Sequence, residues 1–251
     1  MGSRPPLPLT GERTVPGIPA ENYWFRRHEA AYAFAVPLVA DKIVLEVGCG
    51  EGYGTALLGA SADRALGIDY DAQTAAHAAQ TYPQASFVRA NLAALPVPGE
   101  SVDVVVTLQV IEHVWDHGGF VRECLRVLRP VGLLLVTTPN RLTFSPGLSA
   151  PVNPFHTKEF SAAELTDLLT SGGFRIERVF GLHATPRLLD LDARYGGSFV
   201  AAQLQDPSEA WTAQLQSDVA SVSMADFTVL AADLDDVDES LDLVVLARRQ
   251  G

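Results

Sequence analysis

The stretch Ile43-Val44-Leu45-Glu46-Val47-Gly48-Cys49-Gly50-Glu51-Gly52-Tyr53-Gly54 decides the fold of this chain. An apolar run of strand length leads to an acidic residue, and glycines then follow at every second position. Apolar residues resume from Ala56 to Leu58, as they do at the start of a helix. In open α/β sheets, this order of strand, glycine turn and helix presents backbone N–H groups to a ligand. The stretch therefore predicts a ligand-binding turn after the first strand.

The spacing of the glycines separates two kinds of nucleotide site. A dinucleotide fingerprint, G-x-G-x-x-G, would need a glycine three residues after Gly50, where Tyr53 stands. The run from Glu46 reads E-x-G-x-G-x-G, which resembles motif I of the class I S-adenosylmethionine-dependent methyltransferases. A glycine-rich turn in another kind of α/β domain is the alternative that this stretch alone leaves open.

Beyond this stretch, apolar segments of strand length alternate with helical segments, as a parallel sheet requires. Helices are expected at 20–36, 72–82, 118–128 and 162–169, the last with the capping-box residues Ser161 and Glu164. Strands are expected at 43–46, 65–68, 86–89, 102–107, 132–137, 174–180 and 241–247. With the glycine motif, this order implies an α/β fold, the Rossmann-like, seven-stranded and mostly parallel sheet of class I methyltransferases.

The segments outside this alternation divide the chain into regions. Residues 1–19 are rich in Pro and Gly and predict a mobile leader. Residues 20–181 together with 241–251 form the expected cofactor-binding methyltransferase domain. Residues 182–240 predict a mostly helical cap over the substrate site, inserted between the last two strands.

The charge of the chain limits its partners. Its formal charge is 18 − 30 = −12, and Lys and Arg form no block. Phosphate groups are bound by clustered cations. The sequence therefore predicts a small or neutral substrate and argues against nucleic acid and against an anionic membrane surface.

Two further features bear on the compartment. No apolar run approaches the roughly 20 residues of a membrane span, and the N-terminus has no apolar signal region. The two cysteines, Cys49 and Cys124, occupy apolar or glycine-rich positions, which favours buried reduced thiols. These features predict a cytoplasmic protein. They leave the oligomeric state open, and a homodimer is compatible with them.

Three more stretches favour a nucleoside site. Asp69 ends the second expected strand, about twenty residues after the glycine turn, where a carboxylate can accept hydrogen bonds from ribose hydroxyls. NAD enzymes and methyltransferases both use such a residue, so Asp69 does not decide between them. Asn91 and Leu92 follow the third strand, where they can read an adenine edge. The stretch 101–113 resembles motif IV of the methyltransferases of ubiquinone and glycan pathways.

Carried over by position, the resemblance implies a site for S-adenosylmethionine. The methionine moiety would contact Glu46 and the glycine turn, the ribose would contact Asp69, and the adenine would lie against Tyr70. Tyr23 and Arg26 of the first helix are expected to roof the ligand, with a plain packing helix as the alternative. The residues assigned to the cofactor are Tyr23, Arg26, Glu46, Gly48, Gly50, Tyr53, Asp69, Tyr70, Asn91, Leu92 and Gln109.

The acceptor side is expected at the same edge of the sheet. In the families that this sequence resembles, a Glu-His pair after strand four and a later histidine can ligate a divalent metal. Here that implies Glu112, His113 and His156. Gln109 stands where the usual E-x-x-E-H pattern has its first carboxylate, so the site has one charge fewer. Mg²⁺, Mn²⁺ and Zn²⁺ are compatible with such ligands, and a weakly held Mg²⁺ is the ion expected.

The chemistry of methyl transfer gives the same residues a catalytic role. A sugar hydroxyl must lose its proton to a base such as histidine, or gain acidity on a metal, before it attacks. Glu112, His113 and His156 are therefore the candidate catalytic residues. For His113 the alternative is a structural histidine that closes strand four, and for His117 a surface position is favoured.

Further stretches narrow the resemblance to one group of methyltransferases. These stretches are 9–14, 21–23, 27–28, 145–147, 153–156 and 186–197. They resemble the sugar 1-O-methyltransferases of methylmannose polysaccharide biosynthesis, which implies methyl transfer to the 1-OH of a short methylated mannoside.

Two rival functions share parts of the pattern. A small-RNA 3′-end 2′-O-methyltransferase has the same Glu-His and later His, but the charge of −12 weighs against RNA. A cofactor-binding partner protein without activity would have a disabled acceptor site, yet Glu112, His113 and His156 are all present.

Overall fold

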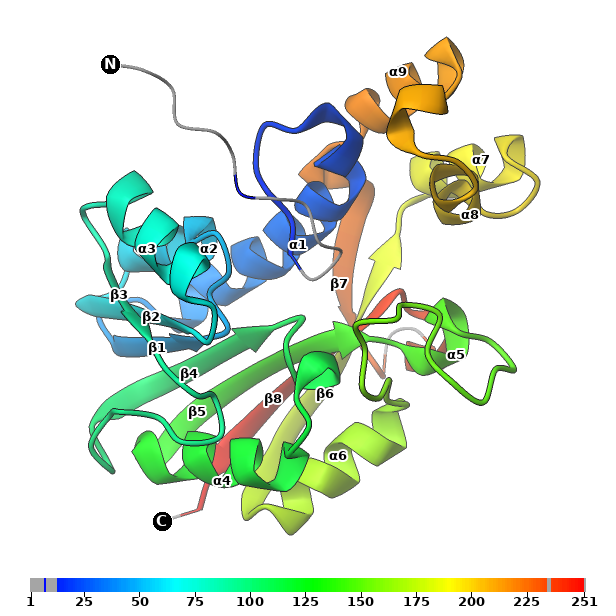
Figure 1. Ribbon diagram of the computed structural model, residues 1–251. Helices are drawn as coiled ribbons and strands as arrows, with labels where there is room; N and C mark the ends of the chain where they lie inside the picture. The colour runs from blue at the N-terminus through cyan, green and yellow to red at the C-terminus, as the bar shows by residue number, and fades with distance from the viewer. Residues whose placement is uncertain (1–6, 8–12, 234–235, 251) are drawn as a thin grey trace.

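An eight-stranded sheet forms the centre of the computed structural model, which describes residues 7, 13–233 and 236–250. The strand order is β3-β2-β1-β4-β5-β8-β6-β7 (Figure 1). The strands are β1 (Ile43–Val47), β2 (Arg64–Asp69), β3 (Ser86–Arg89), β4 (Val102–Leu108), β5 (Leu128–Pro139), β6 (Phe174–Ala184), β7 (Phe227–Ala231) and β8 (Asp242–Arg249).

The direction of the strands confirms a mostly parallel, Rossmann-like sheet. Strands β1 to β5 pair in parallel, from Leu66 beside Ser86 at one side to Leu108 beside Thr137 at the other. The last strand, β8, runs antiparallel between β5 and β6. The carboxyl ends of the parallel strands therefore meet at one edge, where ligands bind in such sheets.

An eighth strand, β7, adds to the seven that were expected and lies within the otherwise mostly helical segment 182–240. The apolar run Phe227–Ala231 pairs antiparallel with the end of β6, from Ala184 beside Phe227 to Phe180 beside Ala231. Strand β6 is correspondingly longer than expected, since it continues to Ala184. The strand-like composition of this run was present in the sequence, but it lay inside a segment that was assigned as a cap.

Helices cover both faces of the sheet (Figure 1). One face packs on α1, α2 and the cap, and the other on α4 and α6, because alternate strand residues point to opposite sides. Val44 of β1 thus joins the α1 side, and Leu45 joins the α4 side. The helices are α1 (Asn22–Ala35), α2 (Tyr53–Gly59), α3 (Ala72–Thr81), α4 (His117–Val127), α5 (Arg141–Phe144), α6 (Ala162–Ser171), α7 (Pro186–Arg194), α8 (Phe199–Leu204) and α9 (Ala213–Ser221).

Side chains and short turns set the helix ends. The expected capping box is present: the Ser161 side chain accepts from the Glu164 N–H, and the Glu164 side chain accepts from the Ser161 N–H. Within the described residues, no helix is both long and apolar enough to cross a membrane. The 3-10 helices are η1 (Pro19–Glu21), η2 (Val36–Leu38), η3 (Ile111–His113), η4 (Ser208–Ala210), η5 (Met224–Asp226) and η6 (Val237–Glu239).

The cap helices α7, α8 and α9 stand beyond the ends of β6 and β7 (Figure 1). Asp218 of α9 joins them by accepting hydrogen bonds from Arg194 and Tyr195 at 2.8 Å. The Nδ2 of Asn22 donates to the carbonyls of Val219 and Val222, each at 2.9 Å. These bonds attach the cap to the start of α1, at the edge of the sheet where the strands end.

The described part of the leader includes buried side chains, those of Leu7, Thr14 and Val15. The mobility expected of residues 1–19 stays a prediction. Residues 1–6 and 8–12 lie outside the described part of the chain, as does most of the stretch 9–14.

Candidate functional site

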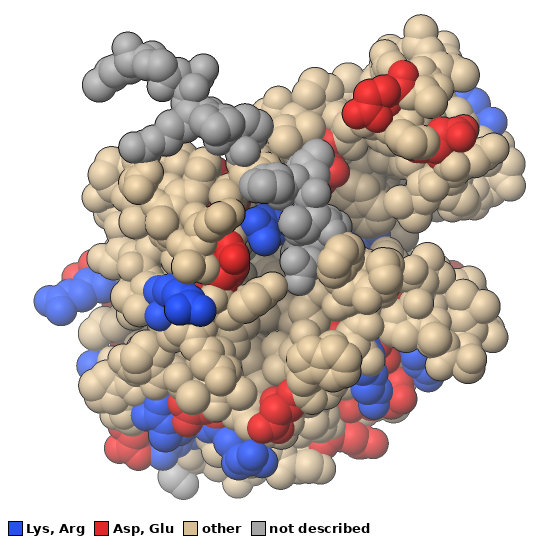
Figure 2. All heavy atoms as spheres, in the orientation of Figure 1, with Lys and Arg blue, Asp and Glu red and all other residues tan. Residues whose placement is uncertain are grey.

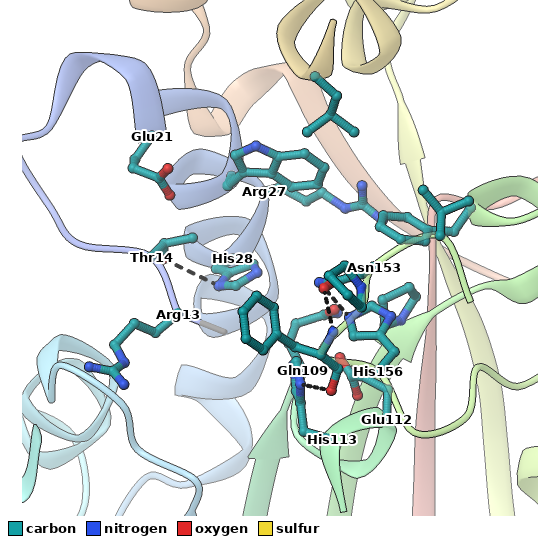
Figure 3. A pocket seen from close by; sticks show the side chains of 17 residues that line it. Arg13, Thr14, Glu21, Arg27, His28, Gln109, Glu112, His113, Asn153 and His156 are labelled. Atoms are coloured by element: carbon teal, nitrogen blue, oxygen red, sulfur yellow. Dashed lines mark hydrogen bonds between the residues drawn. The ribbon is translucent and has the colours of Figure 1, made fainter. Parts of the chain in front are cut away.

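Two adjoining cavities lie at the carboxyl edge of the sheet. The larger has a volume of ≈ 1070 Å³ and borders the glycine turn. The smaller, of ≈ 350 Å³, lies between α1 and the loop before α6 (Figure 3). Gln109 and His113 line both cavities, so the two meet at the end of β4. We name the larger one the cofactor cavity and the smaller one the acceptor cavity.

Most residues assigned to the cofactor lie together on the wall of the cofactor cavity. They are Gly48, Gly50, Asp69, Tyr70, Asn91, Leu92 and Gln109. Gly48 has a φ of +83°, and a Cβ there would lie 2.4 Å from Cγ2 of Val110. Only glycine fits this position, which keeps the backbone close to the cavity.

Asp69 holds the glycine turn while it faces the cavity. Its Oδ2 accepts from the Gly50 N–H, and its Oδ1 accepts from the Asp71 N–H, each at 2.9 Å. Burial raises the pKa of this carboxyl, while the two backbone bonds oppose the rise. Each carboxylate oxygen keeps a lone pair for a ribose hydroxyl. The geometry suits the expected role, and contact with the cofactor stays a prediction.

Glu46 and Tyr53 support the glycine turn from beneath and are absent from the cavity wall described above. The carboxylate of Glu46 accepts hydrogen bonds from the Tyr32 hydroxyl, at 2.5 Å, and from the Thr55 hydroxyl. Burial raises the pKa of Glu46 to about 7. The ring of Tyr53 turns toward α1 and meets Phe25 edge-on, with 5.1 Å between centroids. Their expected contact with the methionine moiety stays a prediction.

The structure places Tyr23 and Arg26 away from the cavity walls, and their contact with the cofactor stays a prediction. Tyr23 is buried among aromatic rings, including Phe199 of the cap at 5.8 Å and Phe227 of β7 at 5.6 Å. Arg26 pairs with Glu29 at 2.7 Å on the outer side of α1. The face of α1 that points at the cavities depends on where the cap packs, which helical periodicity alone does not reveal.

Glu112, His113 and His156 converge in the acceptor cavity (Figure 3). One candidate ligand atom from each lies within 4.8 Å of the others. Glu112 and His113 form part of η3 after β4, and His156 comes from the loop before α6. The two imidazole rings meet edge-on, with 4.8 Å between centroids. The structure thus brings together the three residues that the sequence proposed for the acceptor site.

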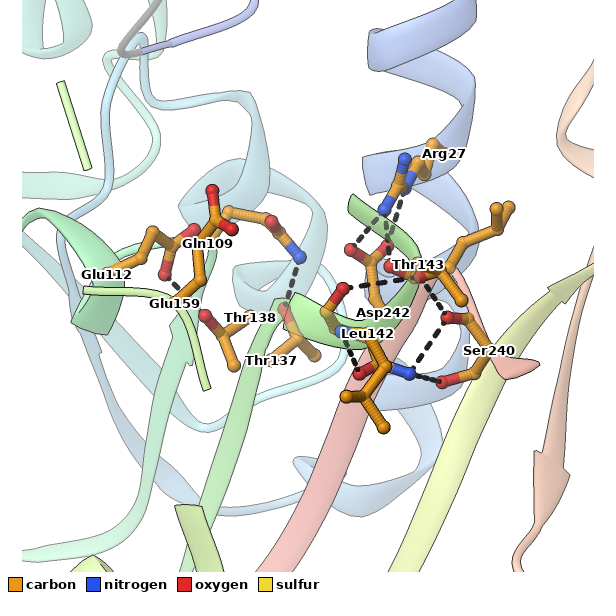
Figure 4. Close-up of polar contacts among 12 residues, drawn as sticks. Arg27, Gln109, Glu112, Thr137, Thr138, Leu142, Thr143, Glu159, Ser240 and Asp242 are labelled. Carbon is orange, nitrogen blue, oxygen red and sulfur yellow. Dashed lines mark hydrogen bonds and ion pairs between the residues drawn. The ribbon is translucent and has the colours of Figure 1, made fainter. Parts of the chain in front are cut away.

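Glu112 is buried and fixed by the neighbouring segments. Its Oε2 accepts from the Thr138 hydroxyl at 2.9 Å (Figure 4). Its carbonyl oxygen accepts from the N–H of Thr157 at 2.6 Å and from the Thr157 hydroxyl at 3.0 Å, which ties the His156 loop to η3. Burial raises the pKa of Glu112 to about 8, so removing its proton requires a compensating positive charge nearby.

In each of the two histidines, a hydrogen-bond partner of Nδ1 orients the ring. Nδ1 of His113 lies 3.0 Å from the carbonyl oxygen of Phe155 and, facing an acceptor, carries the proton. Nδ1 of His156 lies 2.8 Å from Oε1 of the buried Glu159 and donates to it likewise. Nε2 of His156 then accepts from Nδ2 of Asn153 at 3.0 Å. In each ring Nε2 is therefore the basic nitrogen. For His156 to act as a ligand or a base, its Nε2 must exchange the hydrogen bond from Asn153 for the ion or the acceptor hydroxyl.

Gln109 marks the passage between the two cavities. It has a φ of +58°, a conformation that costs a non-glycine residue about 1 kcal/mol. Its Nε2 donates to the Thr137 hydroxyl at 3.3 Å (Figure 4). Such strain persists where the surroundings enforce it, and here it holds the side chain on the wall that the two cavities share.

The charge balance of the acceptor cavity fits a divalent cation. Glu112 and Glu159 are both buried. The remaining oxygen of Glu159, Oε2, is buried with no hydrogen-bond partner among the described residues. Arg27, which also lines the cavity, is matched by Asp242 in a buried ion pair. Two histidines and one carboxylate are a donor set that Zn²⁺ and Mn²⁺ accept readily and Mg²⁺ tolerates.

Two residues of this site were given no site role from the sequence. His28 of α1 lines the acceptor cavity, although it was named only within the stretch 27–28 of the family resemblance. Glu159 lies three residues after His156, and this short spacing beside a candidate ligand was the one signal available.

Comparisons with known proteins agree with this geometry. A family model described as a methyltransferase domain matches residues 45–136. A probable S-adenosylmethionine-dependent methyltransferase of Mycolicibacterium smegmatis is 54% identical over 245 residues, covering 97% of this chain and 95% of the relative. A second one, of Mycobacterium tuberculosis, is 52% identical over 246 residues, with 97% and 90% covered.

A solved structure extends the agreement to the fold. That of a SAM-dependent methyltransferase from Thermotoga maritima matches with a TM-score of 0.63 at 19% identity, covering 91% of this chain and 93% of the other. The chain belongs to the class I S-adenosylmethionine-dependent methyltransferases.

Proposed function

We propose that this methyltransferase transfers the methyl group of S-adenosylmethionine to a hydroxyl group of a small saccharide. The observation that carries the proposal is the cluster of Glu112, His113 and His156, whose candidate ligand atoms lie within 4.8 Å in the acceptor cavity. His113 also lines the cofactor cavity, so the cluster stands beside the path of the methyl group.

The chemistry of a hydroxyl acceptor calls for such a cluster. The sulfonium carries its own activation, so the enzyme must align the methyl group with the attacking oxygen at about 3–3.5 Å. As the oxygen forms its bond to the methyl carbon, the carbon–sulfur bond breaks and the hydroxyl proton must leave. His156 is placed to take that proton through Nε2, with Glu159 stabilising the charged ring through Nδ1.

The alternative to His156 as the base is a divalent cation, which fits the same residues and would be held by Glu112, His113 and His156. When bound, it would raise the acidity of a coordinated hydroxyl, as metals do for water. Mg²⁺ is the ion implied by the resemblance, while two nitrogen donors suit Mn²⁺ or Zn²⁺ equally well.

The walls of the acceptor cavity favour a sugar over a charged substrate. Apolar surface from Trp24, Phe144 and Phe155 lines the cavity together with the polar cluster, and the Phe144 ring lies 5.6 Å from that of His156. Sugars combine apolar C–H faces with hydroxyl edges, so they can stack on such rings while the hydroxyls reach the cluster. With the resemblance noted above, this supports the 1-OH of a short methylated mannoside as the acceptor.

An RNA acceptor is less well supported. On the described part of the face in Figure 2, Lys and Arg side chains are interspersed with Asp and Glu and form no broad basic patch. The chain carries a formal charge of −12. Strand binding needs an electrostatic groove along the backbone. We therefore propose no nucleic-acid and no membrane partner.

The test is methyl transfer from labelled S-adenosylmethionine to matched acceptors. Short methylated mannosides with a free 1-OH should become labelled, and the same mannosides blocked as 1-O-methyl glycosides should not. A small RNA with a 3′-terminal 2′-OH, alongside its 2′-deoxy control, tests the rival. Labelling of the RNA, or of no saccharide in the panel, would overturn the proposal.

A further inference from the structure

His28 lies on the wall of the acceptor cavity that α1 forms, across from Glu112, His113 and His156 (Figure 3). Its half-buried side chain faces the cavity, while Tyr23 and Tyr32 of the same helix are buried in packing. The cluster of Glu112, His113 and His156 can remove the proton of a hydroxyl acceptor, but it contacts the acceptor molecule from one side of the cavity only. A saccharide has several hydroxyls, so a polar group on the opposite wall can form a second hydrogen bond to it.

One edge of the His28 ring is already engaged. Nδ1 lies 3.5 Å from the Thr14 hydroxyl and 3.4 Å from the Tyr53 hydroxyl, both long hydrogen bonds. Those two hydroxyls are 3.3 Å apart and close a triangle behind the ring. The other ring nitrogen points toward the interior of the cavity (Figure 3). The triangle therefore fixes the orientation of the ring and presents one nitrogen to a ligand.

The surroundings keep this ring neutral at physiological pH. Burial lowers the pKa of His28 to about 4, and the nearby charges of Arg27 and His113 lower it further, while Asp242 opposes them. A neutral imidazole forms a hydrogen bond with a hydroxyl without bringing an unpaired charge into the cavity. His28 is thus suited to hold an uncharged acceptor.

We propose that His28 binds the acceptor, through a hydrogen bond between its Nε2 and a saccharide hydroxyl other than the reacting one. The acceptor is then held between α1 and the cluster, and its reacting oxygen is kept in line with the methyl group. Because Nδ1 contacts Tyr53 beside the glycine turn, the same ring also ties the acceptor wall to the cofactor turn. This inference rests on the proposed saccharide acceptor.

A purely structural role for His28 makes a different prediction. If the ring only supports Tyr53 and the glycine turn, its loss disturbs the cofactor cavity and leaves acceptor binding alone. The comparison of acceptor KM with cofactor affinity separates the two roles.

The experiment compares His28→Phe and His28→Gln with the control His117→Gln, a histidine that lines neither cavity. Acceptor KM is measured with a methylated mannoside that the wild type accepts, and S-adenosylhomocysteine affinity is measured by calorimetry. His28→Phe should raise acceptor KM roughly tenfold, since one hydrogen bond is lost, with cofactor affinity and melting temperature nearly unchanged. His28→Gln should recover part of the loss, and His117→Gln should match the wild type.

The outcomes separate this inference from the function on which it rests. Unchanged acceptor KM in His28→Phe, or weaker cofactor affinity with unchanged acceptor KM, overturns the role of His28 alone. A wild type that methylates no saccharide in the panel overturns both the proposed function and this inference.

Discussion

Arg27 of α1 and Asp242 of β8 form a buried, two-pronged ion pair, with N···O distances of 2.7 and 2.6 Å (Figure 4). The side chains are only 4% and 3% exposed. The same guanidinium donates to the carbonyl of Leu241 at 2.7 Å. Arg27 also lines the acceptor cavity, so the pair fixes the first helix and the last strand to each other beneath the site.

Asp242→Asn should strongly destabilise the protein. It leaves the Arg27 charge buried without its partner, which typically costs about 3–5 kcal/mol in the free energy of unfolding. Urea denaturation measures the change. The matched control is Glu177→Gln, which breaks the more exposed pair with Arg248 and should cost at most about 1 kcal/mol. Equal, small effects of both substitutions would contradict the structural importance of the buried pair.

Asp69→Ala should weaken the binding of S-adenosylhomocysteine at least roughly tenfold, because charge-assisted hydrogen bonds to the ribose are lost. Calorimetry measures the affinity. Asp63→Ala is the control, since the Asp63 side chain is 64% exposed and remote from the cavity walls. Unaltered affinity in Asp69→Ala would remove this carboxylate from the cofactor site.

The buried Glu46 should make stability fall as pH rises. The pKa of this group is raised from 4.5 to about 7 in the folded protein, mainly by burial. The folded state therefore holds the proton more tightly, so the contribution is present at low pH and is lost as pH rises from about 4.5 to about 7. That interval corresponds to at most about 3 kcal/mol.

Glu46→Gln removes this titration and serves as the comparison. The free energy of unfolding of the variant should vary less between pH 5 and 8 than that of the wild type, whatever its absolute value. Parallel pH profiles for the two proteins would show that Glu46 does not titrate in this range.

Gln109→Glu should tighten divalent-cation binding. The substitution restores the first carboxylate of the E-x-x-E-H pattern beside Glu112 and His113, and ion affinity rises with the number of charged ligands. Isothermal titration with Mn²⁺ should show at least a roughly tenfold gain, with Gln109→Ala as the uncharged control. Equal affinity in all three proteins would mean that residue 109 does not reach the ion.

The fold could be predicted from the sequence because its signals are local. The glycine turn, the alternation of apolar segments and the residues at strand ends each follow from the nearby sequence, and the strand ends then meet by topology. For this reason Asp69, Asn91 and Gln109 were found together with the glycines. Glu112 and His156 could be joined only through the family resemblance, because nothing local links them.

The remaining parts of the site depend on contacts distant in sequence. Which side of α1 faces the cavities is set by the packing of the cap, so nothing in the sequence placed His28 on the cavity wall. The ring of Tyr53 turns toward α1 because Phe25 and Tyr32 pack on it there. The strand β7 was missed because its pairing partner is the late extension of β6.

The central claim is that the cluster of Glu112, His113 and His156 activates the acceptor hydroxyl. The binding of the cofactor does not depend on this cluster. The most direct measurement is the rate of methyl transfer to an accepted mannoside in EDTA, before and after re-addition of Mg²⁺ or Mn²⁺, with S-adenosylhomocysteine affinity measured in the same samples. EDTA should abolish transfer, the ion should restore it, and cofactor affinity should stay nearly constant. His156→Ala should lower turnover by roughly 10²–10⁴ under the restored conditions. Full activity in EDTA together with full activity of His156→Ala would contradict the claim.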